Sequence, residues 1–305
     1  MKKLITASSH SSFEELRNGY HDRLFDGEGC PYLSSSTIKN LFKESWSKDT
    51  AATKIGERVH DMFCKMANGK DYLIVKAKKR KNSKAYVEEL AEYEATATEE
   101  GKILELCNQT DYDSLKPSYN VAKKFFSSIK FAKKEAEAMA FVTAKEIAEI
   151  DIKSLSPEFI AMHHWIVESK CGVKCAADLI VTPIGSKQHK IYDYKRSAKR
   201  NPTDLTWQIH NLNYAFSVFF YRYVLELIGH KTNPLCTLLM LTDLDIPIQF
   251  DIDTTDHKIY ETYVAPILAK PYIHYYKLRY ALMEGNKVFT YEPPNPKLQQ
   301  EIEED

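Results

Sequence analysis

The first half of the chain carries apolar residues at the three- and four-residue spacing of helices. The segment YLSSSTIKNLFKES predicts a helix that begins after a serine cap. A second helix is expected at about 50–67, and composition rich in Ala, Lys and Glu predicts further helices at 84–106 and, in one or two segments, at 117–149. The apolar stripe of the second helix comprises Ile55, Val59, Met62, Phe63 and Met66.

The pattern changes at about residue 163, where runs of β-branched and aromatic residues alternate with turn signals and predict a sheet. Between the third and fourth runs, LTWQIHNLNYAFSVFFYRYVLELIGH predicts an aromatic-rich amphipathic helix, and a final helix is expected at about 255–284. This order predicts a mixed α/β (α+β) fold in which helices flank a central mixed sheet. The runs are HHWIVES, VKCAADLIVTP, HKIYDYKRS, LCTLLMLTD and IPIQFDI.

The 305 residues are expected to form one core with helical additions at both ends. We predict an N-terminal extension at 1–30, a domain at 31–290 and an acidic tail at 291–305, with the helical part of the domain at 31–160 and the sheet with its flanking helices at 161–290. No apolar run approaches the roughly 20 residues of a membrane span, and the opening segment lacks the apolar stretch of a secretory signal. We therefore expect a cytoplasmic protein without membrane contact.

Cysteine usage and charge narrow the possible partners. Six cysteines are scattered through the chain, and we expect reduced thiols; Cys171 and Cys175, the only close pair, lack zinc-knuckle spacing and are interpreted as buried apolar side chains. The formal net charge is zero, which excludes attraction of nucleic acid by whole-molecule charge. A DNA site would need local basic patches. The candidates are residues 75–84, for which a solvated loop is an equal alternative, and Lys195, Arg196, Lys199 and Arg200.

The segment CAADLIVTPIGSKQHKIYDYKRSAK contains the candidate chemistry, and it is typical of two strands joined by a turn. The first strand brings Asp178; the second brings Asp193 and Lys195, which alternation places on one face, with Tyr194 on the other. Two such carboxylates can hold a hard cation, and a lysine beside them can orient an attacking water and offset charge on a phosphate. The alternative is a surface ion pair, but a carboxylate after apolar neighbours is costly to bury without a metal or a partner.

Over about residues 30–225, the order of motifs resembles that of the PD-(D/E)XK nucleases, in their exonuclease VIII (RecE) and lambda-exonuclease-like branch. The resemblance implies a restriction-endonuclease-like core. Ala177 replaces the proline of the family's name, which supplies backbone shape rather than a ligand, and Leu212 stands where a related motif has tyrosine. The matching motifs are LSSSTIKNLF, GERVH, KKRKNSKAYVEELAEYEATATEEGKIL, WIVESKCGVKCAADLIV with IYDYK, and WQIHNLNYAF.

The resemblance also implies a divalent-metal site for one or two Mg²⁺ or Mn²⁺ ions. Lys195 would position the nucleophile, and Gln208 would orient Lys195 or the scissile strand. Glu168 is a candidate third carboxylate or water-mediated ligand, with solvation at a strand end as the alternative. The implied ligands are His60, Asp178, Asp193 and the backbone carbonyl of Tyr194.

Several further residues are candidates for contact with DNA. Ser34 and Ser36 could contact phosphate, with simple helix capping as the alternative. Arg196, Lys199 and Arg200 continue directly from the proposed catalytic strand. The aromatic run from Trp207 to Tyr223 could stack on bases, but its helical spacing favours core packing.

The expected function is that of a metal-dependent DNA nuclease that hydrolyses phosphodiesters with activated water. The resemblance implies a double-strand exonuclease of a phage-type recombination system, often a ring-shaped homo-oligomer that works with a single-strand annealing protein. An endonuclease with the same site and a catalytically silent, DNA-binding protein of nuclease fold remain as alternatives. A cluster-bearing nuclease of the Cas4 type would need four grouped cysteines, which the sequence lacks.

Overall fold

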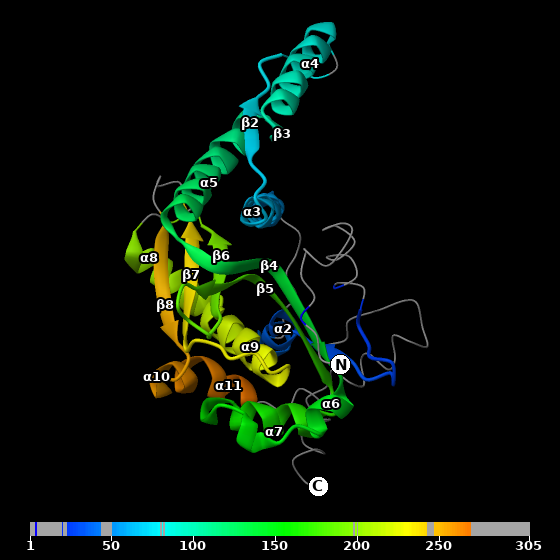
Figure 1. Ribbon diagram of the computed structural model, residues 1–305, viewed down its shortest axis with the longest axis vertical. Coiled ribbons are helices and arrows are strands. Elements are labelled where there is room, and N and C mark those ends of the chain that lie inside the picture. The colour runs from blue at the N-terminus through cyan, green and yellow to red at the C-terminus, as the bar shows by residue number, and fades with distance from the viewer. Residues whose placement is uncertain are drawn as a thin grey trace.

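A mixed sheet flanked by helices forms the centre of the molecule in the computed structural model (Figure 1), as the sequence predicts. The structure describes residues 4, 20, 23–43, 51–79, 81, 83–197, 199, 201–242 and 247–269. Within these residues, the sheet has six strands. They are β1 (Tyr32–Leu33), β4 (Phe131–Val142), β5 (Gly172–Pro183), β6 (Lys190–Arg196), β7 (Leu235–Leu241) and β8 (Ile248–Asp253).

Strand β5 organises the sheet, and its two edges differ. Antiparallel β4 follows one edge, while the other edge pairs with parallel β1 near its start and with antiparallel β6 near its end. Pairing of β5 with β6 runs from Val181 to Leu179, so Asp178 lies just beyond the last pair. β6 continues into parallel β7 and antiparallel β8. The strands therefore leave an unpaired interval at the level of Asp178 and Asp193.

Helices cover both faces of the sheet and bury separate apolar clusters. Helices α3 (Ala51–Ala67) and α5 (Gln109–Ser128) pack on one face with strand residues such as Leu179 and Tyr192. Helix α9 (Tyr214–Leu227) packs on the other face. Helix α2 (Ser35–Lys43), predicted from its serines, packs against α9. Both faces of the sheet are thus shielded from water by amphipathic helices.

The helix predicted between β6 and β7 is two helices. Helix α8 (Pro202–Asn211) ends at Leu212, and Asn213 adopts a left-handed conformation with φ of 50°. The side chain of Asn213 accepts a hydrogen bond from the Phe216 backbone N–H and so caps α9. Asparagine tolerates this conformation better than most residues, and here it starts a new helix in a new direction.

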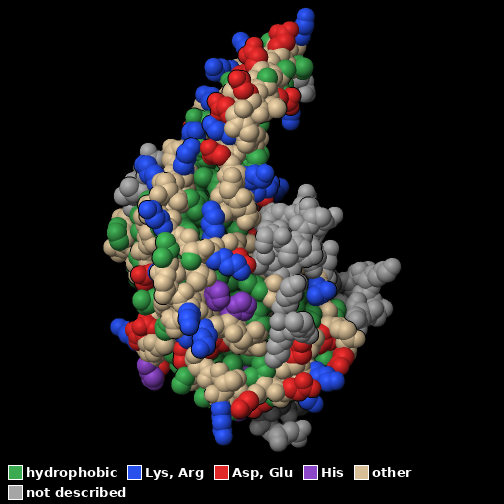
Figure 2. Space-filling model, viewed as in Figure 1, with side chains coloured by type: hydrophobic (Ala, Val, Ile, Leu, Met, Phe, Trp, Pro, Cys, Tyr) green, Lys and Arg blue, Asp and Glu red, His purple; other side chains and the backbone are tan. Residues whose placement is uncertain are grey.

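A small βαβ unit projects from the body as an arm (Figure 1). Parallel strands β2 (Tyr72–Lys76) and β3 (Ile103–Cys107) pair with each other, and α4 (Lys84–Glu99) connects them. Acidic and basic side chains are intermixed over this arm (Figure 2). The predicted helix at 84–106 is therefore correct as far as Glu99, whereas the two strands were not predicted.

Two other sequence predictions are wrong. The segment predicted as helix over 117–149 is helical only to Ser128, then forms β4, and ends in the short helix α6 (Ala144–Ala148). Alanine favours helices in isolation, but pairing along β5 overrides that preference. The run HHWIVES, predicted as a strand, lies in α7 (Ile160–Ser169), because a short apolar run suits a buried helix as well as a strand.

The remaining described elements complete the body. The beginning of the predicted C-terminal helix is confirmed by α10, η4 and α11, of which η4 is a π-helix. Its continuation to 284, the tail at 291–305 and most of the 1–30 extension lie outside the described residues. The short elements are η2 (Ile152–Ser154), η3 (Pro157–Phe159), α10 (His257–Ile259), η4 (Tyr260–Val264) and α11 (Ala265–Leu268).

Two expectations about the chain as a whole can be compared with the structure. All six cysteines lie in described residues and none forms a disulfide, and both Cys171 and Cys175 are buried, as expected. Among the described helices, none combines the length and apolar character that crossing a bilayer requires.

Arg222 lies 3% exposed on α9 and holds together elements far apart in the sequence. Its guanidinium pairs with Glu158 and Glu226 and donates to Thr232 and Thr254. We expect Arg222→Leu to lower the free energy of unfolding by about 3–5 kcal/mol, because two carboxylates that are only 13% and 11% exposed would lose their partner. Urea denaturation followed by tryptophan fluorescence measures the change.

The matched control is Lys84→Leu on the arm. Lys84 and Glu88 are 3.9 Å apart with side chains 94% and 65% exposed, so we expect an unchanged free energy of unfolding. An equally small effect of Arg222→Leu would contradict a structural role of the buried network.

Candidate active site

Three polar side chains from β5 and β6 converge at the point where these strands stop pairing. The Nζ atom of Lys195 lies 2.7 Å from Asp193 Oδ1 and 3.6 Å from Asp178 Oδ2. The backbone N–H of Tyr194 donates to Asp178 Oδ2 at 3.0 Å, so a side-chain acceptor replaces the missing strand partner. Asp193 is fully buried and Asp178 is 5% exposed. The grouping of these three residues, predicted from the sequence, is confirmed.

The structure also confirms that Tyr194 and Lys195 of β6 point to opposite faces of the sheet. The Tyr194 hydroxyl donates to the backbone carbonyl of His60 in α3, on one side of the sheet. Lys195 lies on the other side, with its Nζ 5.5 Å from the centre of the Tyr214 ring in α9. Asp178 connects the two sides, because its Oδ1 faces His60 and its Oδ2 faces Lys195. The site therefore passes through the gap between β5 and β6.

His60 joins the group from helix α3, as its place in the GERVH segment led us to expect. Its Nε2 lies 3.0 Å from Asp178 Oδ1, and its Nδ1 lies 3.0 Å from Glu137 Oε1. Burial lowers the pKa of the imidazole, but neighbouring Cys64 and Asp178 more than offset this, so the pKa lies well above its ordinary value. A cationic His60 thus balances part of the negative charge of the site.

Glu137 is a site residue that the sequence prediction missed. It lies on β4 and is 3% exposed. Ala136 pairs with Leu179 and Ala138 pairs with Ala177, so Glu137 is directly opposite Asp178 across the β4–β5 ladder. Its φ of 48° is left-handed, which is unusual for a residue other than glycine and often accompanies a functional site.

At Glu137, the regular alternation of side chains between the two faces of the sheet is interrupted on both β4 and β5. In a regular strand Ala136 and Ala138 would share a face. Here Ala136 packs in the cluster under α3 and α5, whereas Ala138 packs in the cluster under α9. On β5, Leu179 likewise packs in the cluster under α3 and α5, and Ala177 packs in the cluster under α9. The signal in the sequence was the alternation of alanine in KKEAEAMAF, which its helix-like composition obscured.

Glu168 does not join the group. It lies exposed on α7, a helix that packs against α6 and α11, rather than on a strand beside Asp178. Glu137 occupies the place in the site that the sequence analysis gave to Glu168. The error follows from the wrong strand prediction for HHWIVES, which would have put Glu168 next to β5.

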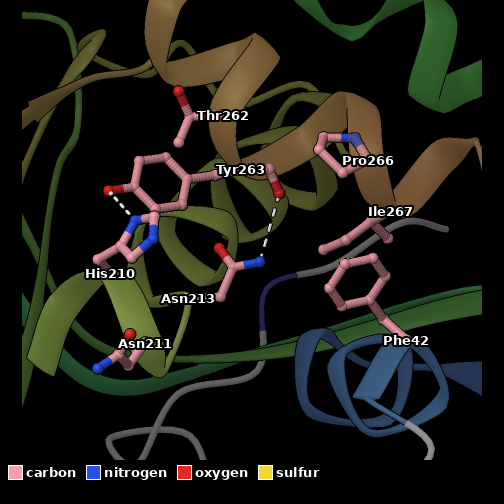
Figure 3. Close-up of a pocket in the computed structure, with 8 residues that line it drawn as sticks. All are labelled: Phe42, His210, Asn211, Asn213, Thr262, Tyr263, Pro266 and Ile267. Carbon is pink, nitrogen blue, oxygen red and sulfur yellow. Dashed lines mark hydrogen bonds between the residues drawn. The ribbon is translucent and has the colours of Figure 1, made fainter.

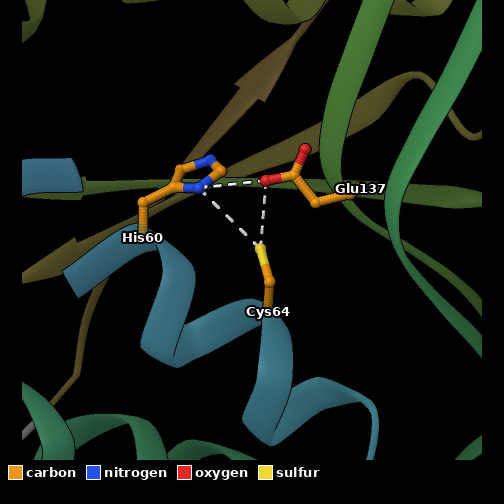
Figure 4. A group of neighbouring side chains, drawn as sticks. All are labelled: His60, Cys64 and Glu137. Atoms are coloured by element: carbon orange, nitrogen blue, oxygen red, sulfur yellow. Dashed lines mark hydrogen bonds and ion pairs between the residues drawn. The ribbon is translucent and has the colours of Figure 1, made fainter. Parts of the chain in front are cut away.

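Cys64 extends the group by one turn of α3 (Figure 4). Its thiol donates to Glu137 Oε1 at 3.3 Å, lies 3.9 Å from His60 Nδ1 and contacts the hydroxyl of Tyr194. The Tyr194 ring also packs against His60 and Phe63. The imidazole is thereby fixed by contacts on several sides, which suits a site that must present its donors in one geometry.

The charges around Asp193 are not balanced. Burial raises the pKa of Asp193 to about 7, since the lowering effect of Lys195 is opposed by the nearby negative charge of Asp178. Among the described residues, Asp193 Oδ2 is buried without any hydrogen-bond partner. For Lys195, burial lowers the pKa, because it disfavours the charged ammonium. The carboxylates of Asp193 and Asp178 outweigh this effect and hold the pKa of Lys195 well above its ordinary value. A positively charged ligand beside Asp193 Oδ2 would satisfy the unpaired oxygen.

His60, Tyr194 and Lys195 line a cleft of about 1250 Å³. Lys195 is 23% exposed, and its ammonium lies between this cleft and the buried carboxylate of Asp193. Arg58 on the same wall is held by Glu105 and Asp111. The cleft brings together many residues predicted to bind metal or DNA: Ser36, His60, Tyr194, Lys195, Arg196, Lys199 and Gln208.

Three further predictions concern Ser34, Gln208 and Arg200. Ser34 caps α2, since its Oγ accepts from the Thr37 N–H at 3.2 Å, so capping describes it better than phosphate contact. Gln208 lines the cleft, and its side-chain oxygen accepts a hydrogen bond from the hydroxyl of Ser197. Ser197 belongs to the same loop as Lys199. Arg200 lies outside the described residues.

Core packing, favoured for the whole aromatic run, is confirmed in α9 but not at Trp207. Phe216, Phe219, Phe220 and Tyr223 of α9 are fully buried, which confirms core packing, whereas Trp207 of α8 is 61% exposed.

A second, smaller cavity of about 260 Å³ lies beyond the α8–α9 junction (Figure 3). Its contacts tie the C-terminal helical segment to this junction: His210 Nδ1 pairs with the Tyr263 hydroxyl at 3.2 Å, and the Asn213 amide donates to the Tyr263 carbonyl at 3.4 Å. Because Asn213 also caps α9, these contacts stabilise the turn that orients Gln208 and Tyr214 toward the larger cleft.

The chain was compared with known proteins. No model of a protein family matches it, and no curated protein matches its sequence significantly.

The unpaired oxygen of Asp193 leads to a stability prediction. At pH 8 in EDTA, we expect Asp193→Asn to raise the free energy of unfolding by about 1 kcal/mol, since an amide can donate to Asp178 while still accepting from Lys195. The pKa of Asp193 is raised on folding, so the wild type loses stability as pH rises through about 7. The difference between variant and wild type should therefore be smaller at pH 6. Urea denaturation at both pH values measures it.

Asp113→Asn is the matched control, because Asp113 is exposed and pairs only with Gln109 among the contacts described. We expect no change there. A destabilised Asp193→Asn variant at pH 8 would show that the Asp193 carboxylate is adequately compensated in the folded protein.

Proposed function

We propose that the chain is a divalent-metal-dependent DNA nuclease. The observation that supports this most is the convergence of three buried carboxylates with a histidine and a lysine, the last two of which line one cleft. Burying so many acidic groups is costly, and proteins retain such clusters where cations are bound or protons are moved. The resemblance of the motif order to PD-(D/E)XK nucleases points in the same direction.

The donor set suits a hard cation. Asp178 and Asp193 would hold Mg²⁺ or Mn²⁺, with Glu137 and the backbone carbonyl of Tyr194 as further donors. His60 would join them as a ligand on losing its proton. The unpartnered Asp193 Oδ2 is a donor that no described hydrogen bond uses. When bound, the ion supplies Lewis acidity, which acidifies water and offsets negative charge on a phosphate.

The chain's own residues would do the rest. The ammonium of Lys195, fixed by Asp193, would orient the attacking water and stabilise charge that develops on the phosphoryl oxygens. His60 would hold Asp178 in place through its Nε2. Arg196 and Lys199 line the cleft beside the site and would bind the phosphate backbone of the substrate.

A double-strand exonuclease of a phage-type recombination system is our preferred form of this activity. It rests on the motif resemblance alone, as do a ring-shaped homo-oligomer and an annealing partner. An endonuclease would use the same residues, and only an endonuclease cuts covalently closed circular DNA. A catalytically silent DNA-binding protein would not need Asp178, Asp193 and Lys195, so the presence of all three in contact argues against it.

Digestion of linear and closed circular duplex DNA with Mg²⁺, Mn²⁺ or EDTA tests the proposal. We expect the wild type to degrade linear DNA with either metal and not with EDTA, and to leave circles intact. Lys195→Ala should retain DNA binding and lose at least about 100-fold in cleavage rate, because the charge that faces the phosphate is gone. Binding without any metal-dependent cleavage by the wild type would sink the proposal in favour of the silent protein.

The identity of the third carboxylate is tested separately by two isosteric changes. We expect Glu137→Gln to lower the cleavage rate by at least about 10-fold, since a buried donor loses its charge beside His60. Glu168→Gln on exposed α7 should cleave like the wild type. Circular dichroism of both variants controls for folding. The reverse pattern would show that Glu137 has only a structural role.

A further inference from the structure

The two ring nitrogens of His60 face different chemical surroundings. Nε2 faces the carboxylate of Asp178, with Oδ1 at 3.0 Å. Nδ1 faces the thiol of Cys64 and the carboxylate of Glu137 (Figure 4). These three donor atoms, one nitrogen, one sulfur and one oxygen, all lie within 4.8 Å of one another. One imidazole thus borders two possible metal sites with different donors.

The separations of the donors on the Nδ1 side match a small tetrahedral ion. Cys64 Sγ lies 3.9 Å from His60 Nδ1 and 3.3 Å from Glu137 Oε1, and the nitrogen and oxygen are 3.0 Å apart. Zinc bonds of about 2.0–2.3 Å at tetrahedral angles place such donors roughly 3.3–3.6 Å apart. Shifts of a few tenths of an ångström would therefore be enough to seat the ion.

The positions of the donors are also favourable. His60 and Cys64 are four residues apart, so one turn of α3 presents both on the same side. Glu137 comes from the facing strand, where the ladder pairs of Ala136 and Ala138 hold the chain on both sides of it. Cys64 is fully buried and Glu137 nearly so, which excludes competing water from two of the three donors. Donors on a helix and a strand are held more precisely than donors on loops.

The thiol decides which ion such a site prefers. Mg²⁺ takes oxygen ligands in an octahedral arrangement and gains little from sulfur, whereas Zn²⁺ binds sulfur, nitrogen and oxygen in fourfold coordination. We infer that His60 Nδ1, Cys64 Sγ and Glu137 Oε1 form a Zn²⁺ site, separate from the oxygen-rich site around Asp178 and Asp193. Three protein ligands leave one coordination position open.

Occupation of this site has a consequence that rests on the proposed function. Zn²⁺ would engage Glu137 and fix the imidazole of His60, both of which border the proposed Mg²⁺ site. Zn²⁺ therefore acts as an inhibitor of the nuclease, with Cys64 as the residue that confers sensitivity. The inhibition does not require Zn²⁺ to displace Mg²⁺ from Asp178 and Asp193.

Metal binding is measured first, on the metal-stripped full chain and without DNA. Co²⁺ serves as a spectroscopic substitute for Zn²⁺, and thiolate ligation gives it a sulfur-to-metal charge-transfer band. We expect this band in the wild type and its loss on addition of Zn²⁺. Competition with a chromophoric chelator then gives the Zn²⁺ affinity. We expect Cys64→Ala to weaken it by at least about 10-fold.

Cys236→Ala is the matched control, because Cys236 is equally buried but lies on β7 in a different apolar cluster. It should bind Zn²⁺ like the wild type. A Co²⁺ complex of the wild type without the sulfur band would overturn the site even if Cys64→Ala failed to fold. Equal Zn²⁺ affinity of a folded Cys64→Ala variant would overturn it as well.

Inhibition is measured second, in DNA cleavage with Mg²⁺ present. Zn²⁺ should lower the rates of the wild type and Cys236→Ala relative to the rate of each without Zn²⁺, at concentrations that leave Cys64→Ala at its own Zn²⁺-free rate. Equal sensitivity of all three would contradict the regulatory role. If the wild type binds Zn²⁺ through Cys64 but cleaves no DNA with any metal, the proposed function fails while the metal site stands.

Discussion

The structure around the site depends on the burial of three carboxylates with little compensating charge. Glu137, Asp178 and Asp193 are all nearly or fully buried, and within the described residues the cationic side chains that face them are Lys195 and His60. Burying an ionised carboxylate without compensation is among the most unfavourable steps in folding. The rest of the fold must therefore supply enough stability to hold these groups together. The apolar clusters on both faces of the sheet and the Arg222 network provide it.

The sheet accommodates these groups by an irregularity at one level. Pairing between β5 and β6 stops at Leu179. At Glu137 on β4 and Asp178 on β5, the side chains before and after these residues point to different faces of the sheet. A regular ladder would have filled this interval with backbone hydrogen bonds and kept each strand's side chains alternating between the two faces. Instead, Asp178 accepts from the Tyr194 backbone and reaches both sides of the sheet. Strain at Glu137 and unsatisfied charge at Asp193 occur at the same place, which is the pattern expected where function outweighs stability.

His60 links the proposed chemistry to its proposed regulation. The carboxylate of Asp178 faces one ring nitrogen, and the thiol of Cys64 and the carboxylate of Glu137 face the other. A single side chain can thus respond to two metals of different character, because the preference of each ion is set by its donors rather than by overall charge. The contacts of Tyr194 with both His60 and Cys64 connect this helix to the strand that carries Asp193 and Lys195. Any change on the thiol side of the ring is therefore close to the residues that would perform hydrolysis.

The sequence by itself determined the fold class and the grouping of Asp178, Asp193 and Lys195, because strand alternation is local and a turn brings the two strands together. The order of motifs also singled out His60, and helical periodicity gave α2 and α3. Glu137 and Cys64 could not be found in this way. The strand that carries Glu137 has the composition of a helix, and only pairing with β5 makes it extended. Cys64 lies one helical turn from His60, but its other partner is Glu137, which only the tertiary structure brings to it. The break at Asn213, the arm and the helical state of HHWIVES were likewise decided by tertiary contacts, since their local propensities allow more than one structure.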